Sequence, residues 1–113
     1  MADENYSTNV FMGTRKNRKM TRKDRPLYSG VLRYFPDALL EVAKVSKSGN
    51  DQHNPGEPLH WAREKSTDQL DALLRHLTDH ARGEILDEDG ERHLAKVAWR
   101  ALAQLQLDLE EHE

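Results

Sequence analysis

Apolar residues between positions 66 and 109 recur in two blocks with the spacing of an α-helix. Within each block they are separated by one, three or four residues, which places them along one stripe of a 3.6-residue helix. The first stripe consists of Leu70, Leu73, Leu74, Leu77 and Ala81, and the second of Leu94, Val97, Ala98, Ala101, Leu102, Leu105 and Leu109. The pattern predicts two helices, at about 67–82 and 88–110, that face each other as an antiparallel hairpin.

The residues beside these blocks carry signals for helix ends. Gly83 follows the first stripe and can adopt the left-handed conformation that often ends a helix. Asp87 or Asp89 can cap the second helix, and Ser66 with Gln69 has the spacing of a capping box for the first. We therefore expect a short acidic turn between two well-bounded helices.

A third, narrower apolar pattern begins at Pro36, a residue suited to the first turn of a helix. Gly49 follows the pattern, so we predict a shorter helix at about 36–48. Residues 49–65 hold several Gly, Pro and Asn residues and predict a long loop. Together these elements predict a small all-α domain.

Composition limits what such a domain can be. The chain has 113 residues, of which 36% are hydrophobic and 33% charged, so it can bury only a modest core. We therefore expect a homo-oligomer, in which a second copy covers apolar area that one copy leaves open. The absence of cysteine excludes disulfides and thiolate metal sites. Because no apolar run reaches the length of a signal peptide or membrane helix, we expect no membrane partner.

The net charge of −3 is unevenly distributed. Residues 1–25 carry seven Lys or Arg and three acidic residues, a net charge of +4, without apolar periodicity. Such a segment can neutralise phosphates on a nucleic acid, but no aromatic residue is interleaved for base stacking. We favour a flexible, solvated arm at 1–25, followed by a single helical domain at 26–113, and expect no nucleic-acid partner.

A basic row follows the second helix of the hairpin. Arg92, Lys96 and Arg100 stand four residues apart, and His93 adjoins them. Guanidinium and ammonium donors at this spacing can hold a di- or triphosphate. Exposed charge rows also pair with acids, as Glu88 could with Arg92. Lys96 and Arg100 have no acidic residue four positions before them within the helix, which favours the phosphate interpretation.

Two further features allow both a structural and a functional interpretation. Trp61, near the end of the long loop, could stack on a purine or could plug the edge of the core. His76 and His80 share a helix face, as two ligands of one metal would. Without a third fixed ligand we favour solvated or hydrogen-bonded histidines.

Several motifs in the hairpin form a familiar set. They are DALLRHL, then RGE with an Asp and a Gly after it, then HLA and a Trp-containing AWxAL segment. The set resembles the N-terminal domain family of phage dATP/dGTP diphosphohydrolases, within the wider helical, MazG-like class of nucleotide pyrophosphohydrolases. PDALLEVAKV and the later Trp61 fit the family's upstream helix and loop, so that the resemblance covers about residues 26–107.

Two departures from the family pattern lie in the last predicted helix. Lys96 stands where the family has a second His, in an HLxH pattern, and Arg100 stands where it has Asn. Protonated Lys and Arg side chains do not ligate metals. The resemblance with these departures implies a nucleotide-handling protein that holds its ligand rather than cleaving it.

We therefore expect a phage-type protein, in the cytoplasm of an infected bacterial host, that captures a phosphate-bearing purine nucleotide. By analogy, such a protein could sequester a nucleotide signal. It would need no cofactor, and its nucleotide-binding residues would be Trp61, Arg75, His76, Arg92, His93, Lys96 and Arg100. Two alternatives stay open. One is a Mg²⁺- or Mn²⁺-dependent dATP/dGTP diphosphohydrolase, with Glu84 and Asp87 holding the metal. The other is a structural helical module without a ligand.

Overall fold

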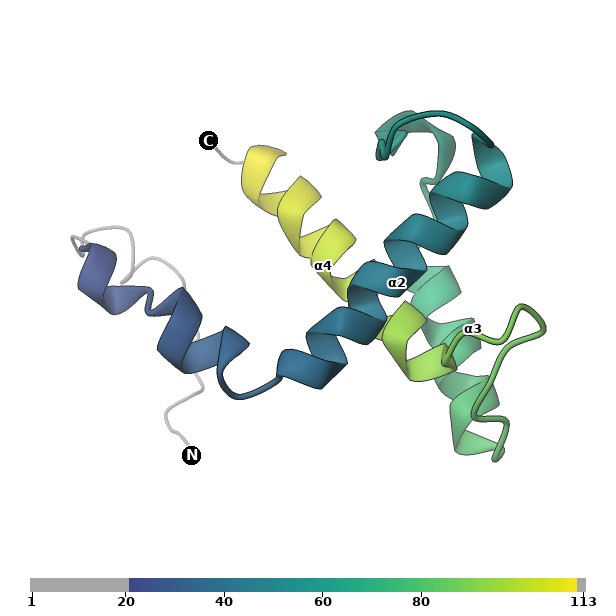
Figure 1. The fold of residues 1–113 in the computed structure, drawn as a ribbon, viewed down its shortest axis with the longest axis horizontal. Coiled ribbons are helices and arrows are strands. Elements are labelled where there is room, and N and C mark those ends of the chain that lie inside the picture. The colour runs from purple at the N-terminus through teal and green to yellow at the C-terminus, as the bar shows by residue number, and fades with distance from the viewer. Residues whose placement is uncertain (1–20, 112–113) are drawn as a thin grey trace. The chain divides into compact units, whose positions relative to one another are not determined.

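A computed structural model describes residues 21–111 of the chain (Figure 1). Most of the predicted basic arm, residues 1–20, lies outside the described residues. The chain divides into two compact units, Met1–Tyr34 and Phe35–Glu113.

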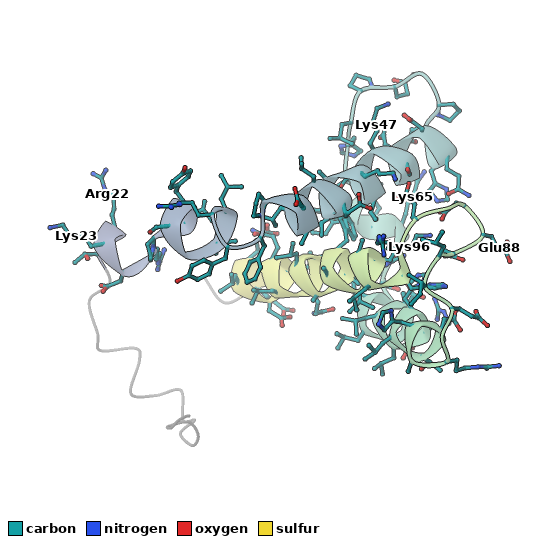
Figure 2. All side chains as sticks on the ribbon, turned by 60° about the horizontal axis from the view of Figure 1, so that its bottom comes forward. Arg22, Lys23, Lys47, Lys65, Glu88 and Lys96 are labelled. Carbon is teal, nitrogen blue, oxygen red and sulfur yellow. The ribbon has the colours of Figure 1, made fainter. Side chains whose placement is uncertain are left out.

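The described part of the first unit contains two short helical segments. A 3-10 turn, η1 (Arg22–Asp24), is closed by the Asp24 carboxylate, which accepts a 2.9 Å hydrogen bond from the Thr21 backbone N–H. A π-helical turn, η2 (Tyr28–Leu32), follows. The Arg22 and Lys23 side chains project from η1 in Figure 2.

The second unit begins with helix α2 (Pro36–His53), which has proline in its first turn as predicted. The helix runs past Gly49, so its predicted end at residue 48 is wrong. The reason lies in Asn50, which is 6% exposed. Its amide donates to the Glu57 carbonyl at 3.0 Å and accepts from the His60 backbone N–H at 3.2 Å. The following loop thus holds the last turn of α2 in place.

The long loop therefore begins later than predicted, and it contains a 3-10 turn, η3 (Arg63–Lys65). Helix α3 (Gln69–Ala81) comes next, and Asp68 precedes it without a side-chain capping bond. The predicted capping box does not form, because the Gln69 amide instead donates to the Ser66 carbonyl at 3.3 Å.

The turn between α3 and helix α4 (His93–Glu111) is longer than predicted. Gly83 has φ +95°, which confirms the expected left-handed helix end. Leu86 then pairs with Arg92 in an isolated antiparallel bridge. This bridge holds residues 88–92 in the turn, so the predicted helix start at 88 and the capping by Asp87 or Asp89 are wrong.

Helix α4 lies at the centre of the second unit. It packs against α3 and against α2 (Figure 1), and residues 21–111 form no β-sheet, so the predicted all-α fold with its helical hairpin is confirmed. Among the described residues, the buried apolar ones are all alanines, namely Ala72, Ala95 and Ala103. Their small side chains let the helix backbones approach closely, while many leucines stay exposed. None of the described helices is long and apolar enough to cross a membrane.

Candidate functional site

A groove of ≈ 1080 Å³ lies between α2, the long loop and α4. Its walls include aliphatic residues such as Val42 and Leu102, together with Trp61 and Trp99. Its polar lining includes His76, Asp89, Glu91, Lys96 and Arg100. A ligand with an apolar part and a charged part would match this combination.

Two tryptophans form the aromatic part of the groove. The Trp61 and Trp99 rings meet edge to face, with centroids 5.8 Å apart. Trp99 is fixed by a 2.5 Å hydrogen bond from its indole N–H to Ser46 Oγ. The Arg63 guanidinium lies 4.3 Å from the Trp61 ring centroid. The Trp61 indole N–H is buried and has no acceptor among residues 21–111, so an acceptor on a ligand would satisfy it.

Arg100 is held in the groove by neutral groups. Its Nη1 donates to Ser66 Oγ at 2.7 Å and to Gln69 Oε1 at 3.0 Å. These bonds fix the guanidinium without neutralising its charge. Arg100 therefore keeps donor capacity and positive charge for an anionic group.

Lys96, at the N-terminal end of α4 (Figure 2), is by contrast engaged by acids. Its Nζ lies 2.8 Å from Asp87 Oδ2 and 2.7 Å from Asp89 Oδ2. Burial opposes the charge on Lys96, but the hydrogen bonds to Asp87 and Asp89 outweigh it and raise the pKa. The sequence analysis missed these partners because it considered only residues four positions earlier in the same helix. Asp87 and Asp89 lie instead in the segment that connects α3 to α4.

The two carboxylates respond in the opposite direction. The hydrogen bond from Lys96 lowers the pKa of Asp87. Burial of Asp89 acts to raise its pKa, but the Lys96 hydrogen bond and one from the Glu91 backbone lower it overall. Both groups are therefore ionised at neutral pH.

A histidine pair lies beside this ion cluster. His76 Nδ1 and His93 Nδ1 are 2.9 Å apart, and His93 is 2% exposed. Asp87 Oδ2 lies 3.9 Å from His76 Nδ1. Burial, followed by the charge of Lys96, lowers the pKa of His76, so this ring is neutral at pH 7. The sequence paired His76 with His80, whereas the structure pairs it with His93.

Glu91 is a groove residue that the sequence analysis did not identify. It is 4% exposed and accepts a 2.5 Å hydrogen bond from Ser48 Oγ. The Lys44 ammonium lies 4.0 Å from its other oxygen. No periodicity marks Glu91, because it belongs to the turn and its partners come from α2.

The structure thus brings together some of the predicted nucleotide-binding residues. Trp61, His76, Lys96 and Arg100 line the groove, and His93 contacts His76. Two others lie outside this lining. Arg75 makes an exposed ion pair with Asp68, at 3.3 Å, and Arg92 is exposed at the end of the turn.

The two candidate metal ligands of the hydrolase alternative fall in different clusters. Asp87 belongs with His76 and His93, whereas Glu84 belongs with Asp79 and His93. In each cluster the potential ligand atoms lie within 4.8 Å of one another. The shared residue is the buried His93, which presents a different ring nitrogen to each side.

Comparison with known families identifies a family for this chain. The family described as dATP/dGTP diphosphohydrolase, N-terminal, matches residues 14–113. Searches of curated proteins and of solved structures gave no match.

Proposed function

The chain belongs to the dATP/dGTP diphosphohydrolase N-terminal domain family, and from this premise we propose that it binds a phosphate-bearing purine nucleotide and holds it without cleavage. The observation that carries the proposal is that Trp61 and Arg100 line one groove. An aromatic ring and a fixed guanidinium are the groups that recognise a base and a phosphate.

The base would lie at the tryptophan end of the groove. Trp61 offers an aromatic ring and a buried indole N–H that has no acceptor in the described part of the chain. Arg63 lies over this ring and pairs with Glu110, so a base that stacks on the same face would have to displace it. Stacking of this kind contributes about 1–3 kcal/mol per base.

The phosphates would lie at the cationic end. Arg100 has neutral hydrogen-bond partners and provides the stronger attraction. Lys96 already donates hydrogen bonds to Asp87 and Asp89. A phosphate must therefore compete with two carboxylates for its ammonium group. We therefore assign the larger part of phosphate recognition to Arg100.

Two features support holding over cleavage. Lys96 and Arg100 are protonated, and protonated side chains neither accept a proton from water nor ligate a metal. The Asp87 and Asp89 carboxylates are weak bases, because Lys96 lowers their pKa values. The corresponding biological role would be to sequester a nucleotide signal, as a phage protein could do in its bacterial host.

The second candidate is metal-dependent diphosphohydrolysis, in which water attacks phosphorus and pyrophosphate leaves. It is supported by the cluster of His76, Asp87 and His93, whose potential ligand atoms lie within 4.8 Å of one another. When bound there, a divalent ion would supply charge stabilisation for the phosphate oxygens. The chain's own residues would orient the ligand in the groove.

One experiment separates the two candidates. The full-length protein is titrated calorimetrically with dATP, dGTP and cyclic purine monophosphates, first in EDTA and then in Mn²⁺. The nucleotides are afterwards analysed by ion-exchange chromatography. We expect binding of at least one of them and its recovery unchanged. Monophosphate and pyrophosphate formed at catalytic turnover, and lost in Asp87→Asn, would establish the hydrolase instead.

A double variant tests the location of binding. Lys96→Ala with Arg100→Ala removes two charge-assisted contacts, each worth about 1.5–3 kcal/mol, and should weaken affinity at least 100-fold. Arg92→Ala, on the exposed side of the same basic row, is the matched control and should bind as the wild type does. Circular dichroism verifies that each variant is folded. Equal affinities in the double variant and the wild type would place the nucleotide elsewhere.

A further inference from the structure

Two buried polar atoms of opposite kind belong to the lining of the groove. Trp61 Nε1 is a donor and Glu91 Oε1 is an acceptor, and neither has a hydrogen-bond partner among residues 21–111. The other Glu91 oxygen accepts from Ser48 Oγ, and the Lys44 ammonium stays 4.0 Å from Oε1. Because buried polar atoms are normally hydrogen-bonded, a ligand that fills the groove should offer an acceptor to Trp61 and a donor to Glu91.

The order of the polar groups along the groove follows helix α4. Glu91 precedes the helix, Lys96 lies at the end of its first turn, and Arg100 lies one turn further on. Four residues of a helix rise about 6 Å along its axis. Trp61 packs on Trp99, and the loop that carries it then forms an ion pair with the last turns of α4. An acceptor, two cations and a donor therefore follow one another along the groove.

The end of the groove near Glu91 disfavours a terminal phosphate. Asp87 and Asp89 lie 2.8 and 2.7 Å from Lys96 Nζ, so that the turn brings three carboxylates to this end. A terminal phosphate carries more than one negative charge at neutral pH and would be repelled by them. A phosphate esterified on both sides carries a single charge, and its second substituent can be a neutral group with an N–H donor.

From this arrangement we propose that the groove binds a dinucleotide, in which two nucleosides are joined through phosphate. One base would lie at Trp61, the phosphates at Arg100 and Lys96, and the amino group of the second base at Glu91 Oε1. A carboxylate accepts well from the exocyclic amino group of a base. The groove volume of ≈ 1080 Å³ is at the upper end for small-ligand sites, which are about 300–1,000 Å³. This inference rests on the proposed nucleotide binding and specifies its ligand.

The test compares dinucleotides with matched mononucleotides. Calorimetry on the full-length protein in EDTA uses diadenosine and diguanosine triphosphates against ATP and GTP, which carry the same number of phosphates. Cyclic di-AMP and cyclic di-GMP are compared with cyclic AMP and cyclic GMP, which separates cyclic from linear ligands. At least one dinucleotide should bind on the order of 10-fold more tightly than its match, the effect of one hydrogen bond to a charged group.

The outcomes separate this inference from the proposed function. Mononucleotides that bind as tightly as every dinucleotide, or more tightly, would overturn the dinucleotide assignment and leave nucleotide binding established. The absence of binding by any nucleotide would refute both.

A variant at Glu91 tests the second base. Glu91→Gln keeps an oxygen for the Ser48 hydroxyl and replaces the unpartnered oxygen by a donor. It should reduce the affinity for the dinucleotide to that for the mononucleotide, and leave the latter unchanged. Glu88→Gln is the matched control, because Glu88 belongs to the same turn and is exposed (Figure 2). Equal dinucleotide affinities in Glu91→Gln and Glu88→Gln would overturn the proposal.

Changing the ligand gives an independent measurement if Glu91→Gln does not fold. The preferred dinucleotide is replaced by one whose bases lack the amino group, with hypoxanthine for guanine or unsubstituted purine for adenine. The wild type should bind this analogue on the order of 10-fold more weakly, because the Glu91 oxygen again lacks its donor. Equal affinities for the two ligands would contradict a base amino group at Glu91.

Discussion

Ser48 Oγ donates a 2.5 Å hydrogen bond to Glu91 Oε2 and so joins α2 to the turn before α4. The contact links residues 43 positions apart in the sequence, and the acceptor carboxylate is almost completely buried. A buried carboxylate is costly without a donor, so this bond holds the acidic turn against the groove. The position of Asp87 and Asp89 follows from it.

We expect Ser48→Ala to destabilise the fold. The variant leaves the buried Glu91 oxygen without its donor, a loss of about 1–3 kcal/mol. Lys47→Ala is the control at the neighbouring position, because its pair with Asp51 is exposed and contributes little. Urea denaturation followed by circular dichroism measures both. Equal midpoints for the two variants would show that the Ser48 bond does not hold the turn.

The small core predicts self-association. Within residues 21–111 the buried apolar residues are three alanines, whereas Leu70, Leu74 and Leu77 of α3 are 55%, 56% and 40% exposed. These leucines lie on one helix face, an unusual amount of apolar surface for a monomer. Light scattering at micromolar concentration should therefore return a multiple of the 13.1 kDa chain mass.

A charge placed on this face should disrupt the assembly. Leu74→Glu is expected to shift the mass toward the monomer, and Asp71→Lys, a charge change at an exposed polar position of the same helix, serves as its control. A monomeric wild type would contradict the prediction directly.

The sequence predicted the position of a helix correctly wherever the spacing of apolar residues within that helix was sufficient to define it. The α3 and α4 stripes and the left-handed Gly83 are local signals, and they located the hairpin. The C-terminal end of α2 depends instead on Asn50, and the start of α4 depends on the Leu86–Arg92 bridge. These contacts join separate segments, and no periodicity encodes them.

The same distinction explains the candidate site. Helical spacing suggested His76 with His80, because it considers one helix at a time. The close pair is His76 with His93, which forms only after α3 and α4 pack. The acids around Lys96 were missed for a similar reason, since Asp87 and Asp89 reach it from the turn.

The ion pair between Asp68 and Arg75 should make the stability of the fold depend on pH. Hydrogen bonds from Arg75 and Ser66 lower the pKa of Asp68. A depressed folded-state pKa stabilises the fold above the unfolded-state pKa, and this contribution is lost as the pH falls through the folded value. Arg75→Ala should raise the pKa of Asp68, as measured by NMR titration of its carboxyl carbon. Lys47→Ala should leave it unchanged, and an Asp68 pKa insensitive to Arg75→Ala would exclude the pair in solution.

Trp61 should report directly on nucleotide binding. In Trp99→Phe it is the remaining tryptophan of the chain's two, so its fluorescence can be followed alone. We expect quenching when a purine nucleotide that binds the wild type is added, because the base stacks on the indole. Replacing Trp61 by Leu should weaken affinity by about 1–3 kcal/mol. An unchanged affinity would assign Trp61 to packing alone.

The chemistry of the guanidinium at position 100 provides the last prediction. Arg100 uses Nη1 to contact Ser66 and Gln69, which leaves its other N–H donors for a phosphate. A lysine would keep the charge but lose the planar set of donors, so Arg100→Lys should weaken nucleotide binding on the order of 10-fold. Arg92→Lys makes the same change at an exposed position and should have no effect. Calorimetric affinities at two salt concentrations measure both variants. If Arg92→Lys and Arg100→Lys reduce affinity equally, the basic row acts through its overall charge and Arg100 has no specific place in the site.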